Sequence, residues 1–136
     1  MKYRTPKENN KYFLPRNTYL HCVYYALQYM DWKKMLSADR DTRGAIRYDK
    51  DRVQTSGDYD STSATAIKML EIQDKMDMID GVIRETTPEG VMRMYLKMSV
   101  CYGFNFYQLQ EKGIPCGKNT FSRLRQKFYF MLNEKI

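Results

Sequence analysis

Apolar side chains recur at helical spacing in two long stretches of this chain. In the first stretch they step by three or four residues, at Leu20, Val23, Leu27 and Met30. In the second they step by three, four, three and four residues, at Met69, Ile72, Met76, Ile79 and Ile83. One face of an α-helix repeats in this way. The pattern predicts helices over residues 16–37 and 62–86, which we expect to pack together as a long helical hairpin.

The start of this predicted hairpin and its packing surface can also be read from the residues. Asn17 or Thr18 is the expected N-cap of the first helix, because a short polar side chain accepts a bond from a free backbone N–H. The apolar positions of the second helix also form an a/d heptad seam of two repeats. Such a seam packs either against the first helix or, in a homodimer, against the 63–86 helix of a second copy, and both interpretations stay open.

The stretch between these helices, residues 39–60, is strongly polar. Six aspartates are mixed with five arginines and lysines, and Gly44 and Gly57 interrupt it. This composition predicts a long polar loop. The segment Asp58-Tyr59-Asp60-Ser61-Thr62 matches the DxDxT motif of aspartate-nucleophile phosphatases. That motif belongs at the end of a buried strand, whereas polar residues precede it here, so we assign its acids to the N-terminus of the next helix.

The remaining residues, 87–136, predict three helices separated by two breaks. Thr87 and Pro88 suit the N-cap and first position of a helix that ends at Gly103. A short helix follows over 105–112, closed by Gly113, and a turn precedes a last helix that starts at Lys118 or Asn119. The turn is Ile114-Pro115-Cys116-Gly117.

A short helix, a tight turn and a basic helix together are typical of a helix-turn-helix. We therefore predict an all-α protein with two regions. Residues 1–86 form an N-terminal arm and the helical hairpin, and residues 87–136 form a tri-helical helix-turn-helix.

The last predicted helix has two chemically distinct sides. On a helical wheel, one narrow arc holds Phe121, Leu124, Phe128 and Leu132, with Arg125 and Met131 beside it. The opposite arc holds Asn119, Ser122, Arg123 and Gln126, with Lys127 at its edge. No acidic residue occurs in this helix before Glu134. Phe130 falls on the polar arc, where we expect it to contact the N-terminal arm, the first helix or a second copy.

Charge strengthens the case for a polyanionic partner. The chain of 136 residues has a formal net charge of +7 and a pI of about 9.3. Residues 1–16 and 118–136 each hold five basic residues and one acidic residue, whereas residues 61–90 hold three basic and six acidic residues. Positive ends and a negative middle suit a protein with one nucleic-acid face and a separate protein-contact face.

Enzymatic chemistry finds little support in this composition. His21 is the only histidine, the three cysteines are Cys22, Cys101 and Cys116, and no CxxC pair occurs. We expect these thiols to be reduced and to bind no metal. The chain lacks a nucleophile–base pair and a phosphate-cradling glycine loop, so we expect no catalytic residues and no cofactor. Without a signal peptide or an apolar run of membrane length, we expect a cytoplasmic protein that does not contact membranes.

These features predict a double-stranded DNA-binding protein. Arginine binds guanine through two hydrogen bonds, and asparagine or glutamine binds adenine in the same way. The expected base-reading residues are Asn119, Ser122, Arg123 and Gln126. The expected phosphate-binding residues are Lys118, Arg125 and Lys127.

Three segments resemble a family of phage and prophage late-gene transcriptional regulators of Gram-positive bacteria, of the RinA/ArpU type. The segments are Tyr12-Phe13-Leu14-Pro15-Arg16-Asn17-Thr18-Tyr19, Gln54-Thr55-Ser56-Gly57 and Asn119-Thr120-Phe121-Ser122-Arg123-Leu124-Arg125-Gln126-Lys127-Phe128. The resemblance implies a sigma-factor region-4-like helix-turn-helix in a bacterial host cell, with the last helix as the DNA reader. This chain departs from the family between Gly103 and Cys116, where aromatic residues are frequent.

Two other function classes stay open. The first is a phage-encoded protein-binding module whose acidic second helix and 39–60 loop engage a host enzyme such as RNA polymerase. The second is a phage assembly or packaging protein with the same fold.

Overall fold

The computed structural model describes the backbone of residues 5–46 and 56–136, and the side chains of residues 5–38 and 64–136. All regular structure in these residues is helical, so the predicted all-α class is confirmed. The helices are α1 (Arg16–Leu27), α2 (Tyr29–Ile46), α3 (Ser56–Thr86), α4 (Gly90–Tyr102), α5 (Phe106–Glu111) and α6 (Lys118–Lys135). None of the helices in the described part of the chain is both long enough and apolar enough to span a membrane.

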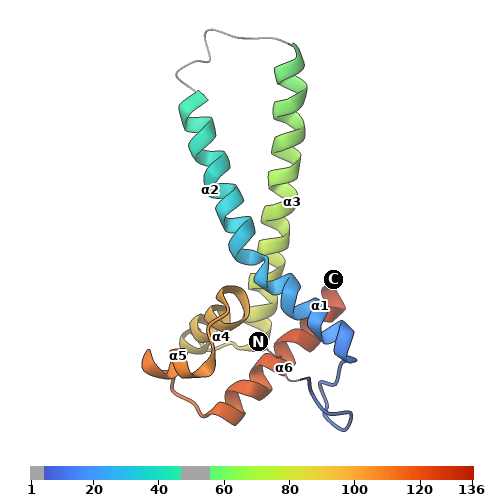
Figure 1. Cartoon of the computed structure of the whole chain (residues 1–136), viewed down its shortest axis with the longest axis vertical. Helices are drawn as coiled ribbons and strands as arrows, with labels where there is room; N and C mark the ends of the chain where they lie inside the picture. Colours follow the sequence, from blue (N-terminus) through green and yellow to red (C-terminus); the bar gives the residue numbers. More distant parts are fainter. Residues whose placement is uncertain (1–4, 47–55) are drawn as a thin grey trace.

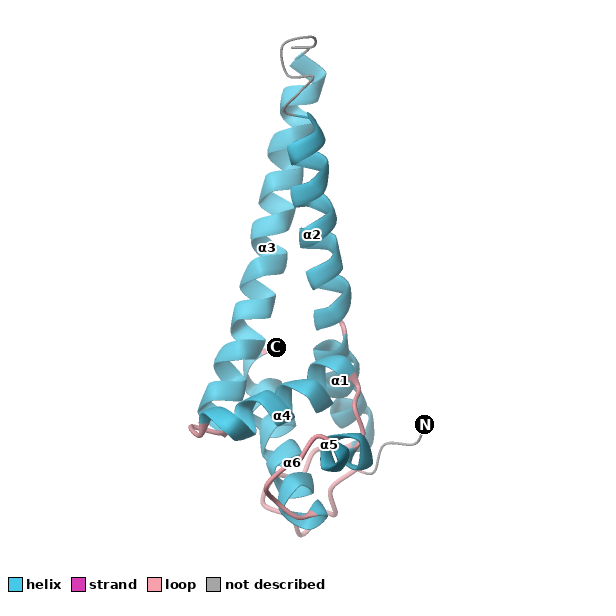
Figure 2. Cartoon of the chain, turned by 90° about the vertical axis from the view of Figure 1, so that its left-hand side faces the viewer, coloured by secondary structure: helices cyan, strands magenta, loops and turns pink. Residues whose placement is uncertain are grey.

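The molecule consists of a body and a long extension. Figure 1 shows α2 and α3 as antiparallel neighbours. Together they extend from a body that contains α1, α4, α5 and α6. The side view in Figure 2 shows the same separation, with α5 and the start of α6 at the end of the body farthest from the extension. The free ends of α2 and α3 therefore lie far from the start of α6, whereas the C-terminal part of α3 packs against α6.

The predicted first helix is interrupted, which corrects the expectation of one helix over 16–37. The backbone N–H of Gln28 donates to Tyr25 O at 3.2 Å, three residues back, and α2 begins at the next residue. The change of direction gives the two segments different packing partners, because α1 packs against α6 and α2 packs against α3, while both contact α4.

The main hydrophobic core joins α1, α2, α3, α4 and α6. Its fully buried side chains include Val23, Ile79, Leu96, Phe128 and Leu132. The heptad seam of α3 belongs to this core, since Ile72, Met76, Ile79 and Ile83 are all buried and Met69 packs against them. The seam is therefore covered within one protomer and is not open to a second copy.

Much of the predicted 39–60 loop is helical, which is a further correction. Helix α2 continues to Ile46 and α3 begins at Ser56, so only residues 47–55 of that stretch lie outside the described residues. A polar and charged composition is compatible with a solvated helix as well as with a loop, so composition alone did not distinguish the two. The Asp58–Thr62 motif lies in the first turns of α3 and not at the end of a strand.

Both predicted N-caps are wrong. Helix α1 already begins at Arg16 with Pro15 as its N-cap, because the Pro15 carbonyl accepts the N–H of Tyr19 at 2.8 Å. Thr87 still belongs to the hydrogen-bond ladder of α3, where its N–H donates to Ile83 O at 3.0 Å. Helix α4 consequently begins only at Gly90, with Glu89 as its N-cap.

Replacing a buried leucine by alanine should show how much of the stability comes from the main core. Leu96 is fully buried, so Leu96→Ala should lower the free energy of unfolding by about 2–5 kcal/mol through lost apolar burial and a residual cavity. The matched control is Leu70→Ala, because Leu70 is 66% exposed and its truncation should change stability by less than about 0.5 kcal/mol. Urea denaturation followed by circular dichroism measures both, and equal costs would contradict the assigned core.

Candidate nucleic-acid interface

A small second core holds α4, α5 and α6 together. Its buried members, one from each helix, are Tyr95, Leu109 and Phe121. The Tyr95 hydroxyl donates to Lys112 O at 3.0 Å, which ties α4 to the segment that follows α5. This core orients the first half of α6 relative to the two preceding helices.

Two glycines and one capping box shape the breaks between these helices. Gly103 ends α4 in the left-handed region at φ 75°, as predicted, and Gly113 follows α5 at φ 91°. The Asn105 side chain accepts the N–H of Gln108 while the Gln108 side chain accepts the N–H of Asn105, both at 2.9 Å. This capping box satisfies free N–H groups at the start of the short helix α5.

The inner side of α6 is the predicted apolar arc. Phe121, Phe128 and Leu132 are buried, and Leu124 is partly buried against both cores. Tyr129 was missing from the prediction, although it is 1% exposed and its ring meets that of Tyr19 edge-on at 5.1 Å. Its place one residue after Phe128 indicates an apolar face wider than the predicted narrow arc.

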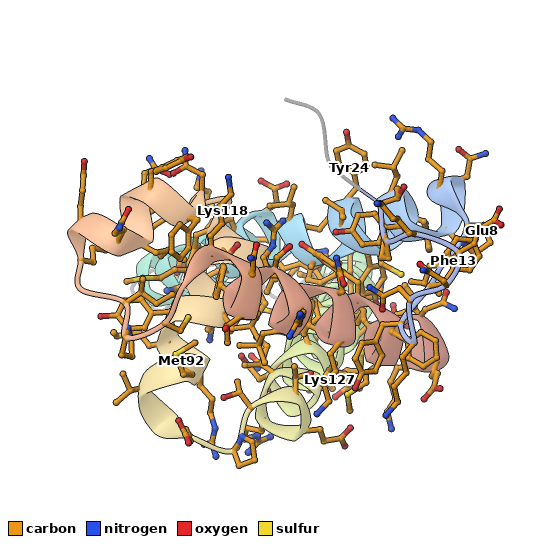
Figure 3. The ribbon with its side chains drawn as sticks, turned by 90° about the horizontal axis from the view of Figure 1, so that it is seen from below. Glu8, Phe13, Tyr24, Met92, Lys118 and Lys127 are labelled. Atoms are coloured by element: carbon orange, nitrogen blue, oxygen red, sulfur yellow. The ribbon has the colours of Figure 1, made fainter. Side chains whose placement is uncertain are left out.

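The outer side of α6 carries most of the predicted DNA-binding residues. Lys118, Asn119, Ser122 and Arg123 are exposed, and Gln126 and Lys127 are partly exposed. Figure 3 shows α6 crossing the face seen from below, with Lys118 near its start. These residues lie at positions i, i+3, i+4 and i+7 or one residue from them, so they form one continuous stripe. We call this set the α6 polar face.

Arg125 does not share the open part of this face. It is only partly exposed, and its Nε is buried without a hydrogen-bond partner among the described residues. The structure therefore brings six of the seven predicted residues together and leaves Arg125 at the flank, beside the core.

One aromatic residue near the start of α6 was not predicted as part of the site. Tyr107 of α5 is 63% exposed. Lys118 Nζ lies 3.5 Å from the Tyr107 hydroxyl and 5.4 Å from the centre of its ring. The contact extends the α6 polar face onto α5. The sequence did contain one indication of this. Tyr107 directly follows Phe106, which was expected to face the core, so Tyr107 falls on a different side of α5.

The N-terminal arm borders the other half of the α6 polar face. Figure 3 shows the arm, with Glu8 and Phe13 labelled, beside the second half of α6. Asn10 Nδ2 donates to Gln126 Oε1 at 2.9 Å, and the rings of Tyr12 and Phe130 meet edge-on at 5.6 Å. Of the contacts that the sequence allowed for Phe130, the one with the arm is confirmed.

A separate charged cluster links the extension to the body. Asp80 Oδ2 accepts a bond from the Tyr29 hydroxyl at 3.0 Å, and Asp80 Oδ1 lies 2.9 Å from Lys97 Nζ. Burial lowers the pKa of Lys97, but bonds to Tyr29 and Asp80 and the charge of Asp80 outweigh it and raise that pKa above its usual value. The pKa of Tyr29 is also raised, first by burial and then by Asp80. Because the cluster joins α2, α3 and α4, we assign it a structural role.

The cysteines do not gather into a metal site. Burial raises the pKa of the Cys22 thiol to about 11 and that of Cys101 to about 12, and all three cysteines are free. Among the described residues, no three His, Cys, Asp or Glu side chains come together as metal ligands.

Comparisons with known proteins leave the interface to be interpreted from its own residues. No protein-family model, curated protein or solved structure matches this chain.

Removing the charge of Asp80 tests the cluster between α2, α3 and α4. Asp80→Asn should lower the free energy of unfolding at pH 7 by about 1 kcal/mol, a value reduced by solvent screening because both side chains are about one-third exposed. A lysine with a raised pKa stabilises the fold fully below about pH 10, the pKa of an unfolded lysine, and this contribution fades as pH rises through the folded pKa. The cost of Asp80→Asn should therefore shrink at strongly alkaline pH and in high salt.

The matched control is Asp74→Asn, which removes the same charge from an exposed position on α3. It should leave stability nearly unchanged. Chemical denaturation at several pH values and salt concentrations measures both variants. Equal losses for both would contradict the linking role.

Proposed function

We propose that this chain binds double-stranded DNA in a sequence-specific manner and acts as a phage-derived transcriptional regulator. The observation that carries the proposal is the α6 polar face, which exposes cations, amides and a hydroxyl and lacks acids before Glu134. In this proposal α4, α5 and α6 form a tri-helical helix-turn-helix, and α6 is the recognition helix. The resemblance to late-gene regulators of the RinA/ArpU type supports the regulatory role.

The shape and chemistry of α6 suit the major groove. An α-helix with its side chains is about 10–12 Å wide, close to the width of that groove. Recognition helices place their N-terminal residues against base edges, and here Asn119, Ser122 and Arg123 occupy those positions on the open side. Lys118 and Lys127 border the stripe, where they can bind phosphates on either side of the groove.

The remaining regions take supporting roles in the proposal. The α2–α3 pair is the helical hairpin of the N-terminal region, and its free end projects away from the body that contains α6 (Figure 1). A homodimer through the 63–86 helix would have to use its outward positions, Ile67 and Leu70, because the heptad seam is buried.

A second candidate function is a protein-binding module that engages a host enzyme such as RNA polymerase. It is favoured by the outer side of α3, where Ile67 and Leu70 are 57% and 66% exposed and Glu71 and Asp74 are exposed beside them. Affinity for duplex DNA separates the candidates, since non-specific basic proteins bind with a Kd of only about 10⁻⁴–10⁻⁶ M at physiological salt.

Arg123 tests base reading by α6. If its guanidinium binds a guanine through two hydrogen bonds, Arg123→Ala should weaken binding to the selected site by about 1–3 kcal/mol and relax the preference at one base pair. The matched control is Arg84→Ala, which removes an exposed arginine from α3. Selection from a random duplex library followed by titration measures both, and a silent Arg123→Ala would refute the reader assignment.

Lys127 tests the predicted phosphate contact. Lys127→Ala should weaken binding to all duplexes by a similar factor and reduce the slope of log affinity against log salt by about 1, because one fewer phosphate is neutralised. Lys135→Ala is the control, since it removes the same charge from the far end of α6. Titrations at four salt concentrations give the slopes, and identical slopes for wild type and Lys127→Ala would exclude the contact.

A further inference from the structure

The side chain of Asn10 joins the N-terminal arm to the α6 polar face, and the orientation of its amide group follows from hydrogen-bond chemistry. The backbone N–H of Tyr12 donates to Asn10 Oδ1 at 2.9 Å. A backbone N–H can only donate, so the carbonyl oxygen of the Asn10 amide must face it. The Nδ2 group of Asn10 consequently points the other way, toward α6.

The same constraint passes on to Gln126. Asn10 Nδ2 donates to Gln126 Oε1 at 2.9 Å. An NH₂ group can only donate, so the Gln126 amide must present its oxygen to the arm. Its Nε2 group has no partner within the described residues and keeps both hydrogens for another acceptor. Three groups therefore form a directional relay from Tyr12 N–H through Asn10 to Gln126.

The arm that carries this relay is held on both sides. Leu14 is buried in the main core, and the Tyr12 ring packs edge-on against Phe130 of α6. Asn10 also closes a local turn, because its N–H donates to Lys7 O at 2.9 Å and its carbonyl accepts from the N–H of Phe13 at 3.1 Å. Asn10 is thus positioned before any ligand arrives.

We propose that Asn10 determines which base Gln126 reads, by holding the Gln126 amide so that it offers a hydrogen-bond donor. This inference rests on the proposed DNA-binding function. A free glutamine amide can rotate to read adenine, which carries both a donor and an acceptor in the major groove. A glutamine that presents Nε2 favours guanine or thymine, whose major-groove edges carry only acceptors, and disfavours cytosine, whose edge carries only a donor.

Substitutions at Asn10 separate this positioning role from simple packing. Asn10→Ala releases the Gln126 amide. Asn10→Asp keeps the acceptor for the Tyr12 N–H but presents a second acceptor to Gln126, so the Gln126 amide turns over and offers Oε1 to the DNA. The matched controls are Asn9→Ala and Asn9→Asp, because Asn9 is the adjacent residue of the same type and is exposed.

The experiment combines selection from a random duplex library with titration of all four base pairs at each position of the selected site. Gln126→Ala first identifies the base pair that depends on Gln126. At that pair, wild type should prefer guanine or thymine over cytosine by about tenfold. Asn10→Ala should reduce this preference to less than about threefold, and Asn10→Asp should shift it toward cytosine or adenine. Asn9→Ala and Asn9→Asp should keep the wild-type order, the latter with uniformly weaker binding.

Side-chain amide NMR of the free protein provides a readout that needs no DNA. The Gln126 NH₂ signals should be ordered in wild type and in the Asn9 variants, and they should become mobile in Asn10→Ala. Unchanged Gln126 signals in Asn10→Ala, or an unchanged base order in both Asn10 variants, would overturn this inference while leaving DNA binding intact. Ordered Gln126 signals in a wild-type protein that selects no sequence would instead refute the proposed function, and the inference with it.

Discussion

Burial of one side of α6 is the constraint on which the rest of this structure depends. Phe121 belongs to the small core with α4 and α5, Phe128 and Leu132 belong to the main core, and Leu124 packs against both. One helix thereby joins the two cores. Because its apolar side is held in both cores, the α6 polar face points away from them, exposed in the first half of the helix and partly covered by the arm in the second half. The packing that stabilises the body also determines which residues can meet a ligand.

The N-terminal arm and α6 together form one surface. Tyr12 packs against Phe130, an aromatic residue on the otherwise polar side of α6, and Phe130 is partly buried. The same arm segment places Asn10 within hydrogen-bond distance of Gln126. The arm therefore has two roles. Its Tyr12 packs against an apolar side chain of α6, and its Asn10 adds a polar group to the candidate interface.

Much of the helical pattern could be predicted from the sequence because it depends on local periodicity. The buried arc of α6, the end of α4 at Gly103 and the break at residues 114–117 follow from side-chain spacing and backbone preference. The break at Gln28 could not be predicted in this way, because it accompanies tertiary packing of α1 against α6 and of α2 against α3. The helical ends of α2 and α3 were missed because polar composition is the same for a solvated helix and a loop.

The residues of the candidate site also differ in whether local periodicity could predict them. Residues of the α6 polar face share one helix, so their common side followed from the wheel. Tyr107 and Asn10 come from other elements, and only tertiary packing brings them to Lys118 and Gln126. Contacts between residues 116 positions apart, such as Asn10 and Gln126, leave no periodic signal in one sequence.

Exposed charge is distributed unevenly between the two ends of the molecule. On α6 and the arm the exposed cations outnumber the exposed acids, whereas the two are balanced on the described side chains of α2 and α3. There, five acids are exposed, at Asp31, Glu71, Asp74, Asp77 and Glu85, and five cations are exposed, at Lys33, Lys34, Lys68, Lys75 and Arg84. The extension projects away from the face that α6 crosses (Figures 1 and 3). Fields summed over such distances orient a protein before contact, and a polyanion attracts the end with the surplus of cations. The free end of the α2–α3 extension would then point away from the polyanion, while the α6 polar face would point toward it.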